Sequence, residues 1–98
     1  MGRTISPSLT WYKRTLPAQE ALARANNYLD KARNTEDRKQ ALKNCDNVKE
    51  ALERMDILGS TNYHDQVIAV YRENGRILDD FGFKADARLN YSEADKLR

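Results

Sequence analysis

The sequence predicts an all-α fold of antiparallel helical hairpins, and three observations lead to this prediction. Both prolines of the 98-residue chain lie before residue 18, so most of the chain lacks the strongest helix breaker. From Leu16 onward, apolar residues recur at intervals of three and four, which is the spacing of one face of an α-helix. The breaks between these periodic stretches span only two to four residues. Such short connections force each helix to run antiparallel to the one before it.

The composition describes one small domain with a thin core, because 40% of the residues are apolar and 33% are charged. The single cysteine excludes an intramolecular disulfide framework and a cysteine-rich zinc site. No apolar run approaches the ~18 residues of a membrane span, and no N-terminal stretch resembles a secretory signal. We therefore expect a soluble protein of a reducing compartment, the cytoplasm.

The N-terminal region divides into two parts. Residues 1–8 contain turn formers and show no apolar period, so we expect a flexible tail followed by a single helical domain over residues 9–98. Four large apolar side chains then follow within eight residues, namely Leu9, Trp11, Tyr12 and Leu16. This stretch is too short to form a stable helix alone. We expect a short helical segment that packs on the later helices and closes the open end of their stack.

Residues 17–58 are predicted to form a first, long hairpin. Its first helix covers about 16–33, with Pro17 in the first turn and a stripe made largely of alanine. Its second helix covers about 36–58, with Asn34 or Thr35 as the N-cap and Gly59 as the stop. The apolar stripe of this second helix steps by four and three through Ala41, Cys45, Val48, Leu52 and Met55.

Residues 62–98 are predicted to form a second hairpin. Asn62 is the expected N-cap of a helix over about 63–81. Gly82 supplies the left-handed residue that ends this helix in a Schellman motif, and the last helix covers about 84–97.

The second hairpin also carries a motif with family-level specificity. Its small and large residues fall at spacings of 4, 3, 9, 4 and 3, through Tyr71, Gly75, Leu78, Ala87, Tyr91 and Ala94. This pattern resembles the tetratricopeptide repeat (TPR), a 34-residue helix-turn-helix unit. The resemblance covers residues 68–98. The first hairpin departs from it, because Leu29 stands at the glycine position and Cys45 at the aromatic one.

The resemblance implies a right-handed stack of about four main helices and a non-catalytic scaffold that binds a protein or an acidic peptide. TPR arrays hold an extended peptide along the face formed by the first helix of each pair. On this chain, that implies Arg72, Arg76 and Asp79, with Arg24, Asn27 and Lys31 as further candidates. Arg72 and Arg76 are four residues apart, so two guanidinium groups could grip one carboxylate. The alternative is that they are ordinary surface charges paired with Glu73, Asp79 or Asp80.

Two other functions remain open. The stripe from Ala41 to Met55 has coiled-coil-like spacing and could form a homodimer. Residues 1–33 carry six basic and two acidic side chains, net +4, and could contact nucleic acid or an anionic membrane, whereas residues 34–98 have 11 basic and 13 acidic ones, net −2. Since both signs are interspersed, the charge pattern argues against nucleic acid or membrane as the main partner. Met1, Gly2 and Ser6 fit a loose pattern for N-myristoylation.

The sequence contains no catalytic signature. A phosphate-binding loop, GxGxxG, HExxH and a nucleophile elbow are all missing. Cys45 lies within an apolar stripe with no histidine or cysteine at metal-ligand spacing, so we expect a small core residue. His64 is expected to be a solvated, neutral side chain. We therefore expect no enzyme, no metal and no cofactor.

Overall fold

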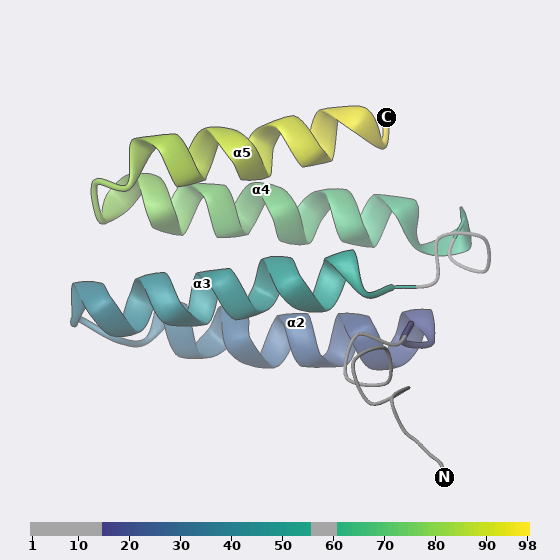
Figure 1. The fold of residues 1–98 in the computed structure, drawn as a ribbon, viewed down its shortest axis with the longest axis horizontal. Helices are drawn as coiled ribbons and strands as arrows, with labels where there is room; N and C mark the ends of the chain where they lie inside the picture. Colours follow the sequence, from purple (N-terminus) through teal and green to yellow (C-terminus); the bar gives the residue numbers. More distant parts are fainter. Residues whose placement is uncertain (1–14, 56–60) are drawn as a thin grey trace, which may run out of the picture.

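The computed structural model describes residues 15–55 and 61–98, and these residues are predominantly helical (Figure 1). Their elements are α2 (Ala18–Arg33), α3 (Arg38–Glu53), the short 3₁₀ helix η1 (Thr61–Tyr63), α4 (His64–Asp80) and α5 (Lys84–Lys96). The described residues include no strand beyond an isolated bridge between Leu16 and Met55. The predicted all-α fold is confirmed. The expected tail over 1–8 and most of the aromatic segment, residues 9–14, lie outside the described residues.

The helices form two antiparallel pairs, α2 with α3 and α4 with α5 (Figure 1). Helix α4 joins the pairs, because it packs on α2 and α3 as well as on α5. Helix α5 lies at the outer side of the stack (Figure 1). None of the helices in the described ranges is both long and apolar enough to cross a membrane.

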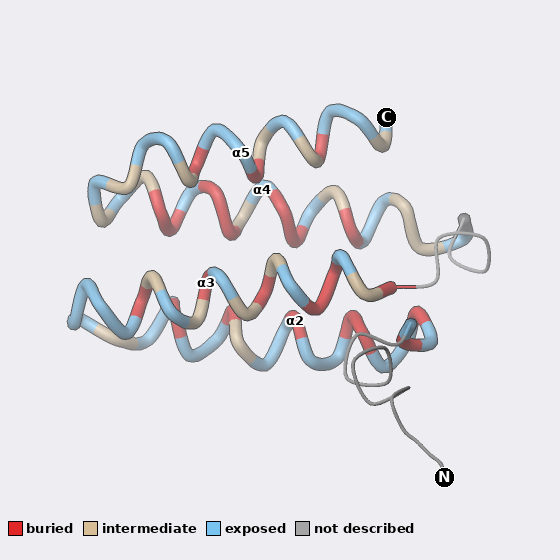
Figure 2. Tube along the Cα trace, in the orientation of Figure 1, coloured by how far each residue is buried: buried red, intermediate tan, exposed pale blue. Residues whose placement is uncertain are grey.

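The core follows the stripes where the helices meet (Figure 2). The alanine stripe of α2 is buried, with Ala21, Ala25 and Ala32 fully enclosed. Small side chains at these positions let α3 approach α2 closely, and the stripe of α3 is buried in turn. That stripe consists of Ala41, Cys45, Val48, Leu52 and Met55.

Helix α3 is shorter than the predicted span of residues 36–58, and its predicted N-cap was wrong. Asp37 is the N-cap, because its carboxylate accepts hydrogen bonds from the backbone N–H groups of Lys39 at 2.9 Å and Gln40 at 3.5 Å. At the other end, the N–H of Leu16 donates to the carbonyl of Arg54 at 2.7 Å. The chain leaves the helix there and pairs with the segment before α2. The expected stop at Gly59 lies outside the described residues.

Two predicted helix starts also differ. Pro17 is the N-cap of α2 and not part of its first turn. The predicted cap of α4 by Asn62 was wrong, because Tyr63 occupies the N-cap position and no side chain caps it. The turn of η1 leads directly into α4, so the backbone winds into the helix without a polar cap.

The predicted turn between α4 and α5 is confirmed. Gly82 has φ +91°, in the left-handed region that glycine tolerates best. Its N–H donates to the carbonyl of Asp79 at 3.0 Å, and the N–H of Phe83 donates to that of Leu78 at 2.8 Å. These two bonds form a Schellman motif, which reverses the chain and places α5 beside α4.

Candidate functional site

The exposed side of α4 carries Arg72 and Arg76, but only one of them is available to a ligand. The guanidinium of Arg76 donates to Glu73 at 2.6 and 2.9 Å and to Asp80 at 2.9 Å. The hydrogen bond and charge of Glu73 raise the pKa of Arg76. Arg76 is therefore a surface charge that is paired within its own helix. The two arginines do not form an open clamp.

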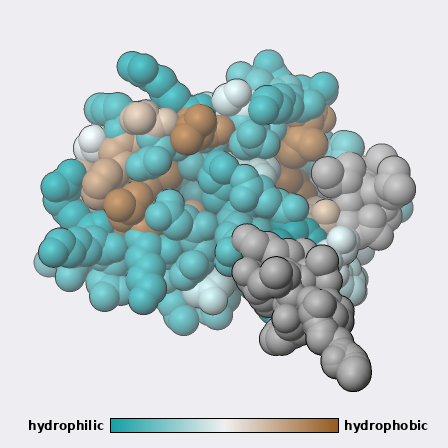
Figure 3. Space-filling model, viewed as in Figure 1, coloured by the Kyte–Doolittle hydropathy of each residue, from teal (hydrophilic) through white to brown (hydrophobic). Residues whose placement is uncertain are grey.

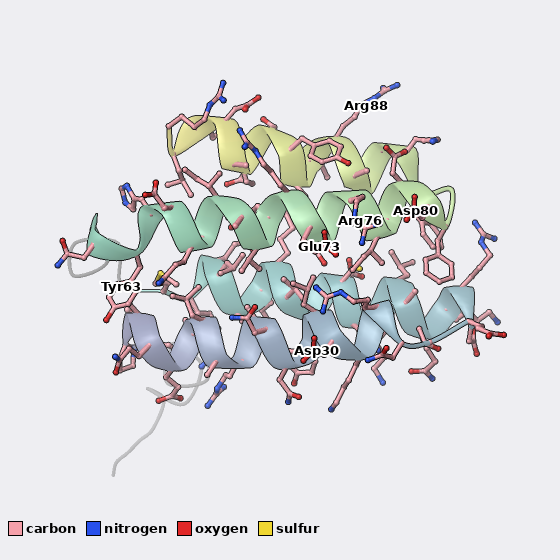
Figure 4. All side chains as sticks on the ribbon, turned by 180° about the vertical axis from the view of Figure 1, so that it is seen from behind. Asp30, Tyr63, Glu73, Arg76, Asp80 and Arg88 are labelled. Atoms are coloured by element: carbon pink, nitrogen blue, oxygen red, sulfur yellow. The ribbon has the colours of Figure 1, made fainter. Side chains whose placement is uncertain are left out.

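The ion pairs of Arg76 continue onto α2. Arg33 reaches the carboxylate of Glu73 at 3.4 Å and that of Asp30 at 2.6 Å. Asp30, Arg33, Glu73, Arg76 and Asp80 therefore form a chain of alternating charges over α2 and α4, and we call it the inter-hairpin network. Figure 4 shows Asp30 on α2 and the three residues of α4 on the same side of the molecule. The hydrogen bond from Arg76, with a further contribution from Arg33, lowers the pKa of Glu73.

Arg72 has a different environment. Its guanidinium makes no ion pair or hydrogen bond with any other residue of the described ranges. It lines an open cleft of about 630 Å³ between the first turns of α4 and the end of α5. The other lining residues are His64, Asp65, Ile68, Ala69, Leu97 and Arg98. We call this site the Arg72 cleft. Its apolar side chains stand beside two arginines and one aspartate, so its charged lining is net basic, which suits a segment with an apolar and an acidic side chain.

Asp79, the third predicted residue on α4, is paired within the chain. The ammonium group of Lys84 donates to its carboxylate at 2.6 Å. This bond links the last turn of α4 to the first turn of α5. Asp79 thus supports the turn at Gly82, at the opposite end of α4 from the Arg72 cleft.

The predicted residues of α2 are not brought together with those of α4. Arg24 pairs with Glu20 at 2.8 Å, Asn27 is exposed, and the ammonium of Lys31 lies 5.5 Å from the centre of the Tyr28 ring. With 3.6 residues per turn, Arg24 and Lys31 lie roughly 160–180° around the helix axis from Arg33. Since Arg33 is the residue that reaches α4, these two side chains turn away from it.

The two residues with reactive side chains do not form a reaction centre. Cys45 is 1% exposed, and burial, followed by the charges of Asp46 and Asp86, raises the pKa of its thiol to about 12. The thiol is therefore protonated at neutral pH and shielded from solvent. His64 is half-buried and lines the Arg72 cleft. In residues 15–55 and 61–98, no three histidine, cysteine or acidic side chains are placed to share a metal ion.

Sequence reasoning missed the contribution of α5 to the Arg72 cleft. Leu97, at the end of the predicted last helix, lines this cleft together with Ile68, and that placement depends on the hairpin geometry. The spacing around Gly82 predicts that α5 runs back along α4, but not which of its side chains meet the start of α4. Comparison with models of protein families, with curated proteins and with solved structures finds no match to this chain.

Proposed function

We propose that this chain is a non-catalytic, TPR-like module that binds a segment of another protein. The observation that carries this proposal is the Arg72 cleft, in which an exposed guanidinium without an internal partner stands beside Ile68 and Leu97. A guanidinium forms strong bidentate bonds with a carboxylate, and the apolar side chains can bury a neighbouring aliphatic group. The ligand that fits is an acidic peptide segment with at least one bulky apolar residue. The reduced, buried thiol of Cys45 is compatible with a cytoplasmic protein.

The packing of α4 supports the TPR-like part of the proposal. Helix α4 contacts both helices of the first hairpin, as expected for stacked helical hairpins. Gly75 lies against the ring of Tyr91, where the repeat pattern requires a small residue.

The two alternative functions have less support. The homodimer would use the α3 stripe, but all five of its residues are buried by contacts within the chain. In the described part of the basic N-terminal third, Arg24, Lys31 and Arg33 each have a partner in the chain. Contact with nucleic acid or membranes would have to break these interactions or use other residues.

Charge reversal at Arg72 tests the proposal. The probe is a fluorescein-labelled peptide of alternating glutamate and leucine, and its affinity is measured by fluorescence anisotropy. Because Arg72→Glu replaces an attraction by a repulsion, we expect binding to weaken about ten-fold or more, which is ~1.4 kcal/mol. Arg88→Glu is the matched control, because Arg88 is exposed on α5 and points away from the helices (Figure 4). It should leave the affinity within about two-fold.

Two results of this binding experiment would count against the proposal. Equal affinities of wild type, Arg72→Glu and Arg88→Glu would contradict the proposal, and so would a failure of the wild-type chain to bind this peptide. Circular dichroism checks that each variant keeps its helix content.

A further inference from the structure

Helices α3 and α5 enclose a second cleft, which adjoins the Arg72 cleft and shares His64 and Leu97 with it. Both pack on α4 and scarcely contact one another. Between them lies a cleft of about 200 Å³. Its apolar lining comes from α3 and the residue region that follows it, from α4 and from the end of α5. The apolar lining residues are Leu52, Met55, Val67, Tyr71 and Leu97. We call it the α3/α5 cleft. Figure 3 shows apolar surface on this side of the molecule near the end of α5.

The same helices bring acidic groups to both sides of this cleft. Glu53 of α3 and Glu93 of α5 line it directly. After burial itself, the charges of Glu93 and Glu53 raise the pKa of Tyr71, which also lines the cleft. Lys49 and Lys96 pair with Glu53 and Glu93 along their own helices, and Lys96 also lines the cleft.

The acidic character continues along the gap between the helices. Asp46 lies two turns before Glu53 on α3, and Asp86 lies two turns before Glu93 on α5. Burial and the charge of Asp86 raise the pKa of Asp46, and the charge of Lys49 acts in the opposite direction. Neither makes an ion pair with a residue of the described ranges. The gap between α3 and α5 therefore holds more negative than positive charge.

We propose that the α3/α5 cleft is a docking site for a partner segment that carries a bulky apolar side chain flanked by lysine or arginine. The cleft volume suits one large aliphatic or aromatic side chain, and the walls provide the carboxylates that basic neighbours need. Charge complementarity selects this partner over an acidic one. The two clefts share His64 and Leu97, but Arg72 lines only the first, and Glu53 and Glu93 line only the second. Charge variants at these residues therefore test the two proposals separately.

Peptide binding with matched variants tests the proposal. The probe is a fluorescein-labelled peptide of lysine and leucine with one central phenylalanine. The double variant Glu53→Lys with Glu93→Lys reverses both acidic walls. We expect this variant to bind the probe about ten-fold or more weakly than wild type, because each wall then repels the basic residues of the peptide. We expect the variant to keep its fold, because the ion pairs that it breaks join partly or fully exposed side chains within single helices.

Two controls separate specific docking from general attraction. Glu20→Lys with Glu36→Lys makes the same change of net charge on α2 and before α3, outside the cleft. It should keep the affinity within about three-fold of wild type. A peptide with serine in place of leucine and phenylalanine should bind at least ten-fold more weakly, because it has no side chain to bury.

Each other outcome overturns the proposal. Failure of the wild-type chain to bind the lysine peptide means that the cleft does not take such a segment. Equal loss in the two double variants means that only net charge matters. If the wild-type chain sediments as a dimer and the variant Glu53→Lys with Glu93→Lys as a monomer, the occupant of the cleft is a second copy of the chain. The effect of Arg72→Glu on the glutamate peptide reports on the proposed function separately.

Discussion

At the scale of single residues, the closest approach between α4 and α5 depends on Gly75. A Cβ atom at this position would lie 2.7 Å from Cε1 of Tyr91 and 3.0 Å from its Cδ1 and Cζ. Such distances are shorter than normal van der Waals contact, so the ring must move to admit a methyl group. Glycine therefore sets how closely α5 can pack.

This contact leads to a prediction for Gly75→Ala. The higher helix propensity of alanine should stabilise α4 by about 1 kcal/mol, but overpacking against Tyr91 costs about 1–3 kcal/mol. We expect the free energy of unfolding, measured with urea, to fall. In a Tyr91→Ala background the obstacle is gone, and the same Gly75→Ala change should raise stability. The same effect in both backgrounds would show that the ring does not limit the packing.

A second residue-scale feature was not predicted. Asn74 of α4 is fully buried, and its Nδ2 donates to Oδ1 of Asn90 at 2.9 Å and to the carbonyl of Cys45 at 3.1 Å. One side chain thus joins α3, α4 and α5 inside the core. Asparagine in a helical stripe predicts a solvated position, and only the approach of three helices buries it here.

At the scale of elements, the two ends of α3 are fixed by different kinds of contact, one between neighbouring residues and one between residues far apart in the sequence. The cap of α3 is local, because Asp37 accepts from N–H groups two and three residues ahead. The sequence predicted Asn34 or Thr35 as the cap, two or three residues before the cap that the structure shows. The end of α3 involves a distant residue, because the carbonyl of Arg54 accepts a hydrogen bond from the backbone N–H of Leu16.

The cap assignment predicts different effects for neighbouring substitutions. Asp37→Ala should lower the free energy of unfolding by about 1 kcal/mol, because two N–H groups in the first turn lose their acceptor. Asp37→Ser, which keeps an acceptor, should recover most of this loss. Thr35→Ala should have a smaller effect, because its hydroxyl accepts only from the N–H of Asp37, at 3.2 Å, outside the helix. A larger loss for Thr35→Ala would contradict the assignment of the cap.

At the scale of the whole molecule, the inter-hairpin network is an electrostatic connection between the two hairpins. Arg33 of α2 and Arg76 of α4 share the carboxylate of Glu73. The pKa of Glu73 is lowered in the folded chain, so its contribution to stability is present above its ordinary value of 4.5. The contribution is lost as the pH falls through the lower folded value, because the carboxyl is then protonated in both states.

This network predicts a pH-dependent effect of Glu73→Gln. At pH 7 the variant should be less stable than wild type by roughly 0.5–1 kcal/mol, as expected for partly exposed ion pairs. The difference in unfolding free energy should shrink as the pH is lowered from 5 to 3. Urea denaturation at several pH values measures it, with Arg33→Gln and the double variant giving the coupling across the hairpins. A difference that is constant between pH 7 and pH 3 would exclude the charge of Glu73 as its cause.

The sequence by itself determined the helical class, the two hairpins, the apolar stripe of α3 and the turn at Gly82. These features depend on periodicity and on residues close together in the chain, so local pattern is sufficient to predict them.

Only the tertiary structure decided the end of α3, the burial of Asn74, the ion pair between Arg33 and Glu73 and the place of Arg72 in a cleft. Arg72 and Arg76 occupy equivalent places in the helical pattern, yet Arg76 has acidic neighbours on its own helix and Arg72 lies beside the end of α5. The two clefts likewise form from side chains on different helices. Their geometry depends on how the hairpins pack, and that packing depends on contacts between residues far apart in the sequence.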